Sequence, residues 1–247
     1  MEQEKNTVRA VERALDILLC FTGTESELGL SEISKQVGLH KSTVHRLLAS
    51  LESRGFIRKH PQSEKYRLGW SVLELVKHAF QSNELASIVL PEMVQLRDRI
   101  NETISLYIRA GHERIRIQAV ESHHPIRSVA NIGHRFPLYI GASGKVLLAF
   151  SDDSVRQSVF LEMNERFSKT ELEKQLNDIQ EKGFAVSIEE REPGGAAVAA
   201  PILDRHGQLI AALSVSGPVD RFHAQAVEQF SKEVIAAAEQ ISKMLLY

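Results

Sequence analysis

The sequence predicts an α+β protein in which an N-terminal winged helix-turn-helix is joined by a linker helix to a C-terminal α/β domain. Two observations carry this prediction. Short amphipathic helices and one basic hairpin come first, and helices alternating with β-rich segments make up the rest of the chain. We therefore expect the winged helix-turn-helix over residues 1–68, the linker helix over 69–82 and the second domain over 83–247.

The spacing of apolar residues predicts three helices before the hairpin. Residues 8–21 have an amphipathic helical pattern. Ser31 is expected to cap a short second helix, which Gly38 ends. A third helix starts at residues 40–42 and ends at Gly55. Two short helices joined by a tight turn are the arrangement of a helix-turn-helix.

A hairpin and a further helix follow. Residues 56–59 and 65–68 predict two short strands on either side of a polar turn. Residues 70–80 then place apolar side chains on a wide helical stripe. A lone helix with so much apolar surface is unfavourable in water, so we expect this linker helix to pack on a partner.

The net charge of −2 conceals one basic segment. Residues 35–67 contain eight lysines and arginines against two acids. Such a segment is usually a solvated face, and charge alone does not identify a polyanion partner.

The local pattern favours double-stranded DNA as that partner. Basic and hydroxyl side chains on a second short helix can reach phosphates and guanine edges in the major groove, and the hairpin can follow the backbone or the minor groove. The alternative is a small basic protein-interaction module. The residues expected at the DNA are Ser31, Lys41, Ser42, Thr43, His45, Arg46, Arg58, Lys59, Lys65 and Arg67.

From about residue 83 the pattern changes to helices that alternate with β-rich runs. No internal repeat is present, and a meandering sheet with flanking helices is typical of α+β domains. We expect helices over 90–100, 144–150, 168–182 and 223–246, and strands over 103–108, 115–120, 184–188, 198–203 and 209–216.

A turn of small residues opens an apolar helix at residues 141–148. Backbone amides at a helix start attract anions such as a carboxylate, although an ordinary tight turn into a core helix fits the sequence equally well. The segment is not a phosphate-binding P-loop, because it lacks the loop length and the hydroxyl after the lysine. It is not a nucleophile elbow, because Lys145 stands where the second glycine belongs.

Composition and the remaining polar residues exclude several other classes. The chain has 247 residues, 43% of them hydrophobic, and its apolar stretches are far shorter than the roughly 20 residues of a membrane span. The polar start has no secretory signal, and Cys20 is the single cysteine. We expect a cytoplasmic protein without a membrane partner, with Cys20 in the core rather than acting as a redox thiol.

Neither a metal nor a cofactor is expected. His123 and His124 precede a proline and have no cysteine or carboxylate cluster at ligand spacing, so we interpret them as loop residues. Residues 189–192 are interpreted as a solvated loop rather than an acid–base group, with closure over a ligand as an alternative.

Two sets of motifs, one in each half of the chain, stand in the same order as in a known family. In the first half they are segments 30–33, 38–48, 55–56 and 66–69. In the second half they are segments 183–186, 189–190, 194, 199–202, 207 and 212–218. These motifs resemble the IclR family of bacterial regulators, and the resemblance covers nearly the whole sequence.

The resemblance implies a GAF/profilin-like C-terminal domain that binds a small effector. Ser187 and Ala197 depart from members that carry an acid or a cysteine there, so effector identity does not transfer. Alternating small residues at Ser214 and Ser216 also fit tight strand packing. By position, the effector-binding residues are Gly141, Ala142, Ser143, Ser187, Ala197, Ser214 and Ser216.

The resulting hypothesis is a ligand-responsive regulator of catabolic genes, acting as a repressor. It would bind a near-palindromic operator as a homodimer, joined partly by the first and linker helices, and the resemblance also implies a homotetramer. Pocket polarity favours a small carboxylic acid.

Two alternatives remain. An enzyme could use Ser143 or Ser214 as nucleophile, but no histidine–acid pair stands at a recognisable spacing from either. A structural DNA-bridging protein would leave the pocket residues without a role.

Overall fold

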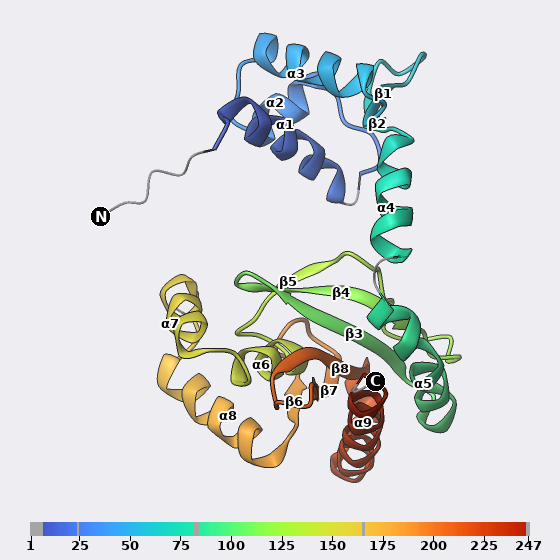
Figure 1. Ribbon diagram of the computed structural model, residues 1–247, viewed down its shortest axis with the longest axis vertical. Coiled ribbons are helices and arrows are strands. Elements are labelled where there is room, and N and C mark those ends of the chain that lie inside the picture. The colour runs from blue at the N-terminus through green and yellow to red at the C-terminus, as the bar shows by residue number, and fades with distance from the viewer. Residues whose placement is uncertain (1–6, 24, 82–83, 165, 246–247) are drawn as a thin grey trace. The chain divides into compact units, whose positions relative to one another are not determined.

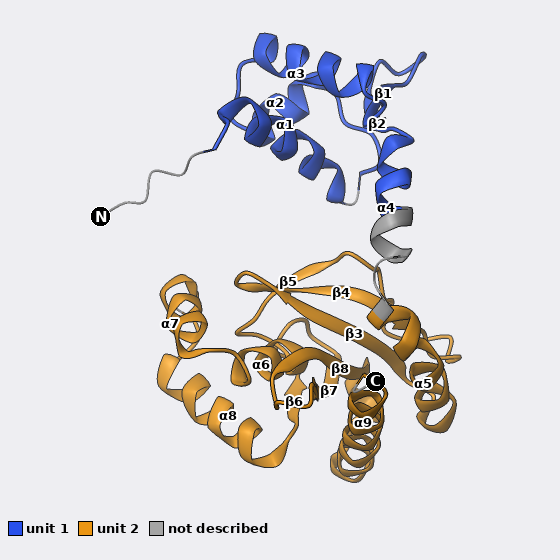
Figure 2. Cartoon of the chain, in the orientation of Figure 1, with its two compact units in different colours: residues 1–83 blue, residues 84–247 orange. Residues whose placement is uncertain are grey.

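The computed structural model describes residues 7–23, 25–81, 84–164 and 166–245. The chain divides into two compact units, residues 1–83 and 84–247 (Figure 2). Among the described residues, no helix has the length and apolar character that crossing a bilayer requires.

The N-terminal unit is a helix-turn-helix with a two-stranded wing, as predicted (Figure 1). Its core contains Ile17, Ile33, Val44 and Leu48, all fully buried, so the first three helices and the wing share one hydrophobic cluster. Its elements are α1 (Arg9–Leu19), η1 (Cys20–Thr22), α2 (Leu30–Gln36), α3 (Lys41–Ser53), β1 (Ile57–Lys59), β2 (Tyr66–Leu68) and α4 (Ser71–Gln81).

Gly38 makes the tight turn between α2 and α3. Its φ of 65° lies in the left-handed region, which a residue with a Cβ adopts only at a cost. The second helix therefore ends where the sequence predicted, and it ends because Gly38 adopts a left-handed backbone conformation.

The predicted cap of that helix is wrong. Gly29 is the N-cap and Ser31 is the second residue of α2. The backbone N–H of Gly29 donates to Oε2 of Glu32, three residues further on, with 2.6 Å between the nitrogen and the oxygen. A carboxylate at the third helical position thus satisfies the amide of the N-cap residue, whereas a capping hydroxyl at Ser31 would have accepted an amide of the first helical turn.

The Cys20 side chain is half-buried and packs against the hydrophobic cluster of this unit. Burial is the main cause that raises the pKa of its thiol, with the nearby Asp16 carboxylate as the second cause. Because the thiolate is the reactive form, a raised pKa agrees with the interpretation of Cys20 as a core residue.

The C-terminal unit is built on one six-stranded sheet whose neighbouring strands are all antiparallel. The strand order across the sheet is β5-β4-β3-β8-β7-β6. The strands are β3 (Thr103–Ala110), β4 (Glu113–Val120), β5 (Arg135–Pro137), β6 (Ala185–Ile188), β7 (Gly195–Leu203) and β8 (Leu209–Pro218).

Helices cover both faces of this sheet (Figure 1). Helices α5 and α9 pack on one face through Met93, Leu106, Leu213 and Val234, while the other three long helices pack on the opposite face, where Tyr107 and Ala199 lie. The helices are α5 (Glu84–Ile100), α6 (Ala142–Ala149), α7 (Asp153–Glu162), α8 (Lys169–Lys182) and α9 (Ala224–Met244), with the short η2 (Val219–Arg221) before α9.

The structure differs from the expected elements at several boundaries. Helix α5 begins at Glu84 and contains Pro91 in its interior, whereas the sequence predicts a helix start beside that proline. Strand β5 and helix α7 were not predicted. Residue 82 of the expected linker helix and residue 246 of the expected final helix lie outside the described residues.

Candidate effector pocket and DNA interface

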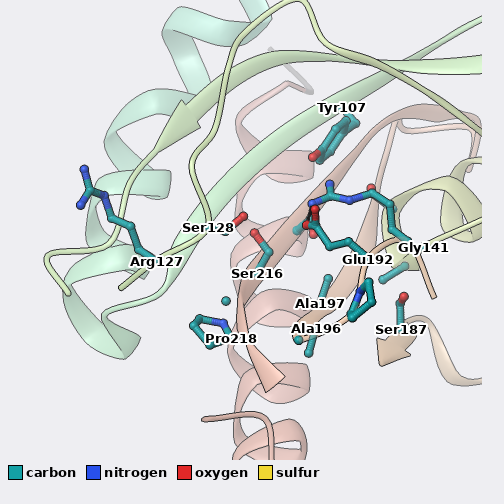
Figure 3. Close-up of a pocket in the computed structure, with 18 of the residues that line it drawn as sticks. Tyr107, Arg127, Ser128, Gly141, Ser187, Glu192, Ala196, Ala197, Ser216 and Pro218 are labelled. Carbon is teal, nitrogen blue, oxygen red and sulfur yellow. Dashed lines mark hydrogen bonds and ion pairs between the residues drawn. The ribbon is translucent and has the colours of Figure 1, made fainter. Parts of the chain in front are cut away.

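A cavity of about 180 Å³ lies in the C-terminal unit, between the start of α6, strands β6 to β8 and the 191–195 loop. Figure 3 shows Tyr107 on one side of it and Ser187, Ala196 and Ala197 on the other. All the residues assigned to effector binding in the sequence line this one cavity: Gly141, Ala142, Ser143, Ser187, Ala197, Ser214 and Ser216.

Strand register explains how three of these residues meet. Ser187 of β6 pairs with Ala197 of β7, which pairs with Ser216 of β8. Paired residues of antiparallel strands project to the same face of the sheet, so these small side chains form a row under α6. Their small volume leaves the space that the cavity occupies.

The start of α6 is partly occupied by a carboxylate of the protein itself. Glu190, in the loop after β6, accepts the backbone N–H of Gly141 at 3.0 Å with one oxygen. Its other oxygen lies 2.5 Å from Nζ of Lys145, a side chain that is 4% exposed. The expected anion-binding character of this helix start is thus already used at Gly141 by an internal anion.

The loop of residues 189–192 is more than the solvated loop of the sequence analysis. Glu190 binds the start of α6, and Arg191 and Glu192 line the cavity and contact each other. Figure 3 shows the Glu192 side chain lying between Tyr107 and Ala197.

Arg114 is the main lining residue that is not among the residues predicted from the sequence. Its side chain is buried, and Nη1 donates to the carbonyl oxygens of Pro137 at 2.5 Å and Ile140 at 2.7 Å. The guanidinium lies over the rings of Tyr107 and Phe136, with its Cζ atom 5.5 and 5.1 Å from their centroids. Burial lowers the pKa of Arg114 to about 10.

Arg116 lies two residues further along β4, on the same face. Its Nε and Nη2 atoms donate to the hydroxyl of Tyr107 at 2.9 and 2.6 Å. In the sequence, charged Arg114 and Arg116 alternate with apolar Ile115 and Ile117. In a strand with one solvated face this alternation predicts that the arginines point to water, whereas here both arginines are buried.

The residues expected at DNA lie on two parts of the N-terminal unit. Lys41, Ser42, His45 and Arg46 are exposed on the first half of α3, and Thr43 beside them is half-buried. Ser31 is exposed near the start of α2. The first turn and a half of α3 therefore presents a basic and hydroxyl-bearing surface.

Three of the four cations of the wing have partners within the unit. Nζ of Lys59 lies 2.7 Å from Glu64, and Arg67 pairs with Glu27 at 3.7 Å. Arg58 stacks on the ring of Trp70 with its Cζ atom 4.5 Å from the centroid. The remaining cation is Lys65, which is half-buried.

His123 and His124 lie in the loop after β4 and contact Asp98 and Asn101. Within the described ranges, no group of three or more His, Cys, Asp or Glu residues is arranged to hold a metal ion.

A winged helix-turn-helix followed by a sheet domain, with a pocket lined by small, hydroxyl-bearing and charged residues, defines the class of ligand-responsive transcription regulators. The family model for the IclR helix-turn-helix domain matches residues 10–61, and the model for the C-terminal domain of bacterial IclR regulators matches residues 77–243. The chain belongs to the IclR family of bacterial transcription regulators, whose members bind DNA and small-molecule effectors.

Individual relatives agree with this assignment. The regulator KdgR of Escherichia coli K12 is 33% identical, and the alignment covers 100% of this chain and 96% of KdgR. The transcriptional repressor IclR of the same strain is 29% identical over 95% of this chain and 89% of its own. The crystal structure of an IclR regulator from Alicyclobacillus acidocaldarius is 27% identical, with a TM-score of 0.85 over 96% of this chain and 99% of that chain.

The enzyme interpretation is set aside on these grounds, because the family and the named relatives are transcription regulators.

Proposed function

We propose that this regulator represses catabolic genes and that a small carboxylic acid, bound in the cavity beside α6, changes its affinity for operator DNA. The observation that carries the proposal is the convergence of the small and hydroxyl-bearing residues of four separate chain segments on one cavity. A cavity of roughly 150 Å³ suffices to hold benzene, so about 180 Å³ suits a small organic acid. Repression is supported by the relative named as a repressor.

The DNA contacts of the proposal follow from α3. Its exposed residues Lys41, Ser42, His45 and Arg46 and the half-buried Thr43 would enter the major groove, with Ser31 at the flanking phosphates. The wing residues Arg58, Lys59, Lys65 and Arg67 would lie along the backbone. Since three of them have partners in the protein, phosphates must compete with those partners, and we assign the larger share of DNA affinity to α3.

The proposed assembly is a homodimer on a near-palindromic operator, which a second pairing extends to a tetramer. Helix α1 has two apolar faces. One packs on the core, and the other is solvent-exposed at intervals of three and four residues through Val8, Val11, Leu15 and Leu19, each more than half exposed. The linker adds Trp70, Leu73, Leu75 and Val76. A second copy of this chain is the partner that would cover the exposed apolar residues of α1 and of the linker symmetrically.

The division of roles is part of the proposal. Residues 1–68 would bind DNA, residues 69–82 would transmit the change, and residues 83–247 would bind the effector and other copies. A regulator of this kind acts where the DNA lies, so we propose that it works in the cytoplasm. Effector binding shifts DNA affinity only by the difference in its own affinity for the two states, typically about 1–3 kcal/mol.

The experiment is fluorescence anisotropy of the purified full chain on DNA from upstream of its own gene, without and with a panel of small carboxylic acids. The proposal expects saturable, sequence-selective binding that one acid weakens or strengthens about five- to 150-fold. If upstream DNA and DNA selected from a random pool both show no sequence preference, the regulator proposal fails. If selective binding is found but no compound alters it, the ligand response fails.

A further inference from the structure

The charges that line the cavity are unevenly compensated. Arg127 lies 2.8 Å from the carboxylate of Glu121, and Figure 3 shows its guanidinium turned away from Ser216. Arg191 contacts the carboxylate of Glu192. Among the described residues Arg114 forms no ion pair, although it is the most deeply buried of the three, and the charge of the nearby Glu190 offsets its burial only in part.

Arg114 also has an unused donor. Its Nη1 atom is engaged by the two carbonyl oxygens described above, but Nε is buried and has no hydrogen-bond partner in the described part of the chain. Ser216 Oγ, which lines the same cavity, is likewise buried and without a partner. A buried polar atom left unpaired is costly, so two such atoms on residues that line one cavity point to the place where polar atoms of a ligand belong.

The position of the guanidinium is fixed before any ligand arrives. Tyr107 and Phe136 cover its faces, and its Nη1 bonds hold the turn that leads into α6. A Cβ added at Gly144 would meet both this Nη1 atom and the Leu138 carbonyl oxygen, so α6 approaches the guanidinium closely only because residue 144 is glycine. Such a preorganised cation binds an anion with little loss of conformational entropy.

We propose that Arg114 is the charge anchor of the effector: a carboxylate of the ligand accepts the Nε–H of Arg114 and the hydroxyl of Ser216. This assignment rests on the proposed function and adds which residues bind the carboxylate of the effector. The ligand must therefore be an anion, because a neutral group of the same shape leaves the buried guanidinium uncompensated. The start of α6 has a lesser part, since Glu190 already holds the Gly141 amide.

The depressed pKa of Arg114 agrees with this proposal. A guanidinium whose pKa falls to about 10 through burial is short of compensating negative charge, and a bound carboxylate supplies it.

The test compares wild-type full-length protein with Arg114→Gln, Arg114→Lys and the matched control Arg127→Gln. DNA affinity without added compound shows whether each variant is folded and competent. Thermal melting then gives the affinity for each acid of the panel and for the corresponding primary amide. We expect wild type to bind an acid but not the corresponding amide. Arg114→Gln should bind that acid at least about tenfold more weakly than wild type, and the affinity of Arg127→Gln should lie within about threefold of the wild-type value.

Equal acid affinity of wild type and Arg114→Gln overturns the inference, as does equal affinity of wild type for an acid and its amide. A neutral compound that alters DNA binding in both proteins overturns the inference and the proposed class of effector, but it leaves ligand-responsive control of DNA binding standing. If Arg114→Gln does not fold, the Nε–H resonance of Arg114, identified by its loss in Arg114→Lys, is followed in wild type. A shift on adding the acid supports the inference, and no shift at saturation refutes it.

Discussion

Glu190 and Lys145 form an ion pair that fastens the loop after β6 to the first turn of α6, with 2.5 Å between Oε1 and Nζ. Nζ of Lys145 also lies 3.2 Å from Oε1 of Gln175 on α8, so the pair connects three elements around the cavity. The lysine is almost fully buried, and Glu190 is its only carboxylate partner within the described residues.

Removing this carboxylate should destabilise the C-terminal unit. Glu190→Ala leaves the Lys145 ammonium buried without an anion and frees the Gly141 amide, a loss of about 3 kcal/mol. For a unit of this size we expect the melting temperature to fall by roughly 6–12 °C. Differential scanning calorimetry measures this, with exposed Glu173→Ala on α8 as the control that should melt like wild type.

A double variant makes this test specific. Lys145→Met combined with Glu190→Leu removes both charges, so it should lose less stability than Glu190→Ala alone. A double variant that is less stable than Glu190→Ala would mean that the pair acts through something other than mutual charge compensation.

Ser216→Ala should separate binding from packing. The Ser216 hydroxyl is buried and unpaired, so its removal should leave the melting temperature unchanged or raise it by about 2–4 °C. Loss of a hydrogen bond to the acid should weaken effector affinity roughly three- to tenfold. A lower melting temperature with unchanged affinity would instead favour the packing explanation for the small residues of β8.

Low pH should loosen the loop that carries Arg127. The hydrogen bond from Arg127 and a second one from the Ala130 amide lower the pKa of Glu121 below its usual 4.5. A depressed carboxyl pKa gives stability that is present above pH 4.5 and is lost as the pH falls through the lower, folded-state value. The NMR shift of the Ala130 amide should titrate with a midpoint below pH 4.5, and this transition should be absent in Glu121→Gln. A midpoint at pH 4.5 or above would contradict the lowered pKa of Glu121.

Arg46→Ala should weaken operator binding, because Arg46 is exposed on the first half of α3. We expect about a tenfold loss of affinity, and a decrease of about one in the salt slope if the contact is to phosphate. Arg54→Ala, at the far end of the same helix, is the matched control and should change affinity little. Identical binding of wild type and Arg46→Ala over a salt titration would remove Arg46 from the interface.

The sequence predicted the parts of this protein that depend on local pattern. The helical spacing that ends at Gly38 and resumes at residue 41 located α2 and α3, because a positive φ and an amphipathic period leave direct traces in sequence. The lining residues of the cavity were located through family resemblance and not through spacing, since strand register brings β6, β7 and β8 together and the packing of α6 on the sheet adds the fourth segment.

The missed features depend on tertiary context. Whether Arg114 faces water or a cavity is decided by β5, α6 and Phe136, which lie in other segments and cover its side of the sheet. Strand β5 is only three residues long and is paired with β4, so it has too little pattern of its own to be recognised. The cap of α2 was missed because Glu32 and Gly29 act as a pair that a serine between them obscures.

Filling the cavity tests most directly whether it governs DNA binding. Ala197 lines the cavity, and Ala197→Leu would occupy the space between Ser187 and Ser216 with an apolar side chain. The anisotropy of operator DNA is measured for wild type and variant, without and with the acid to which wild type responds. We predict similar affinity without acid and no response of the variant to the acid. A variant that keeps the full response would contradict the assignment of this cavity as the effector site.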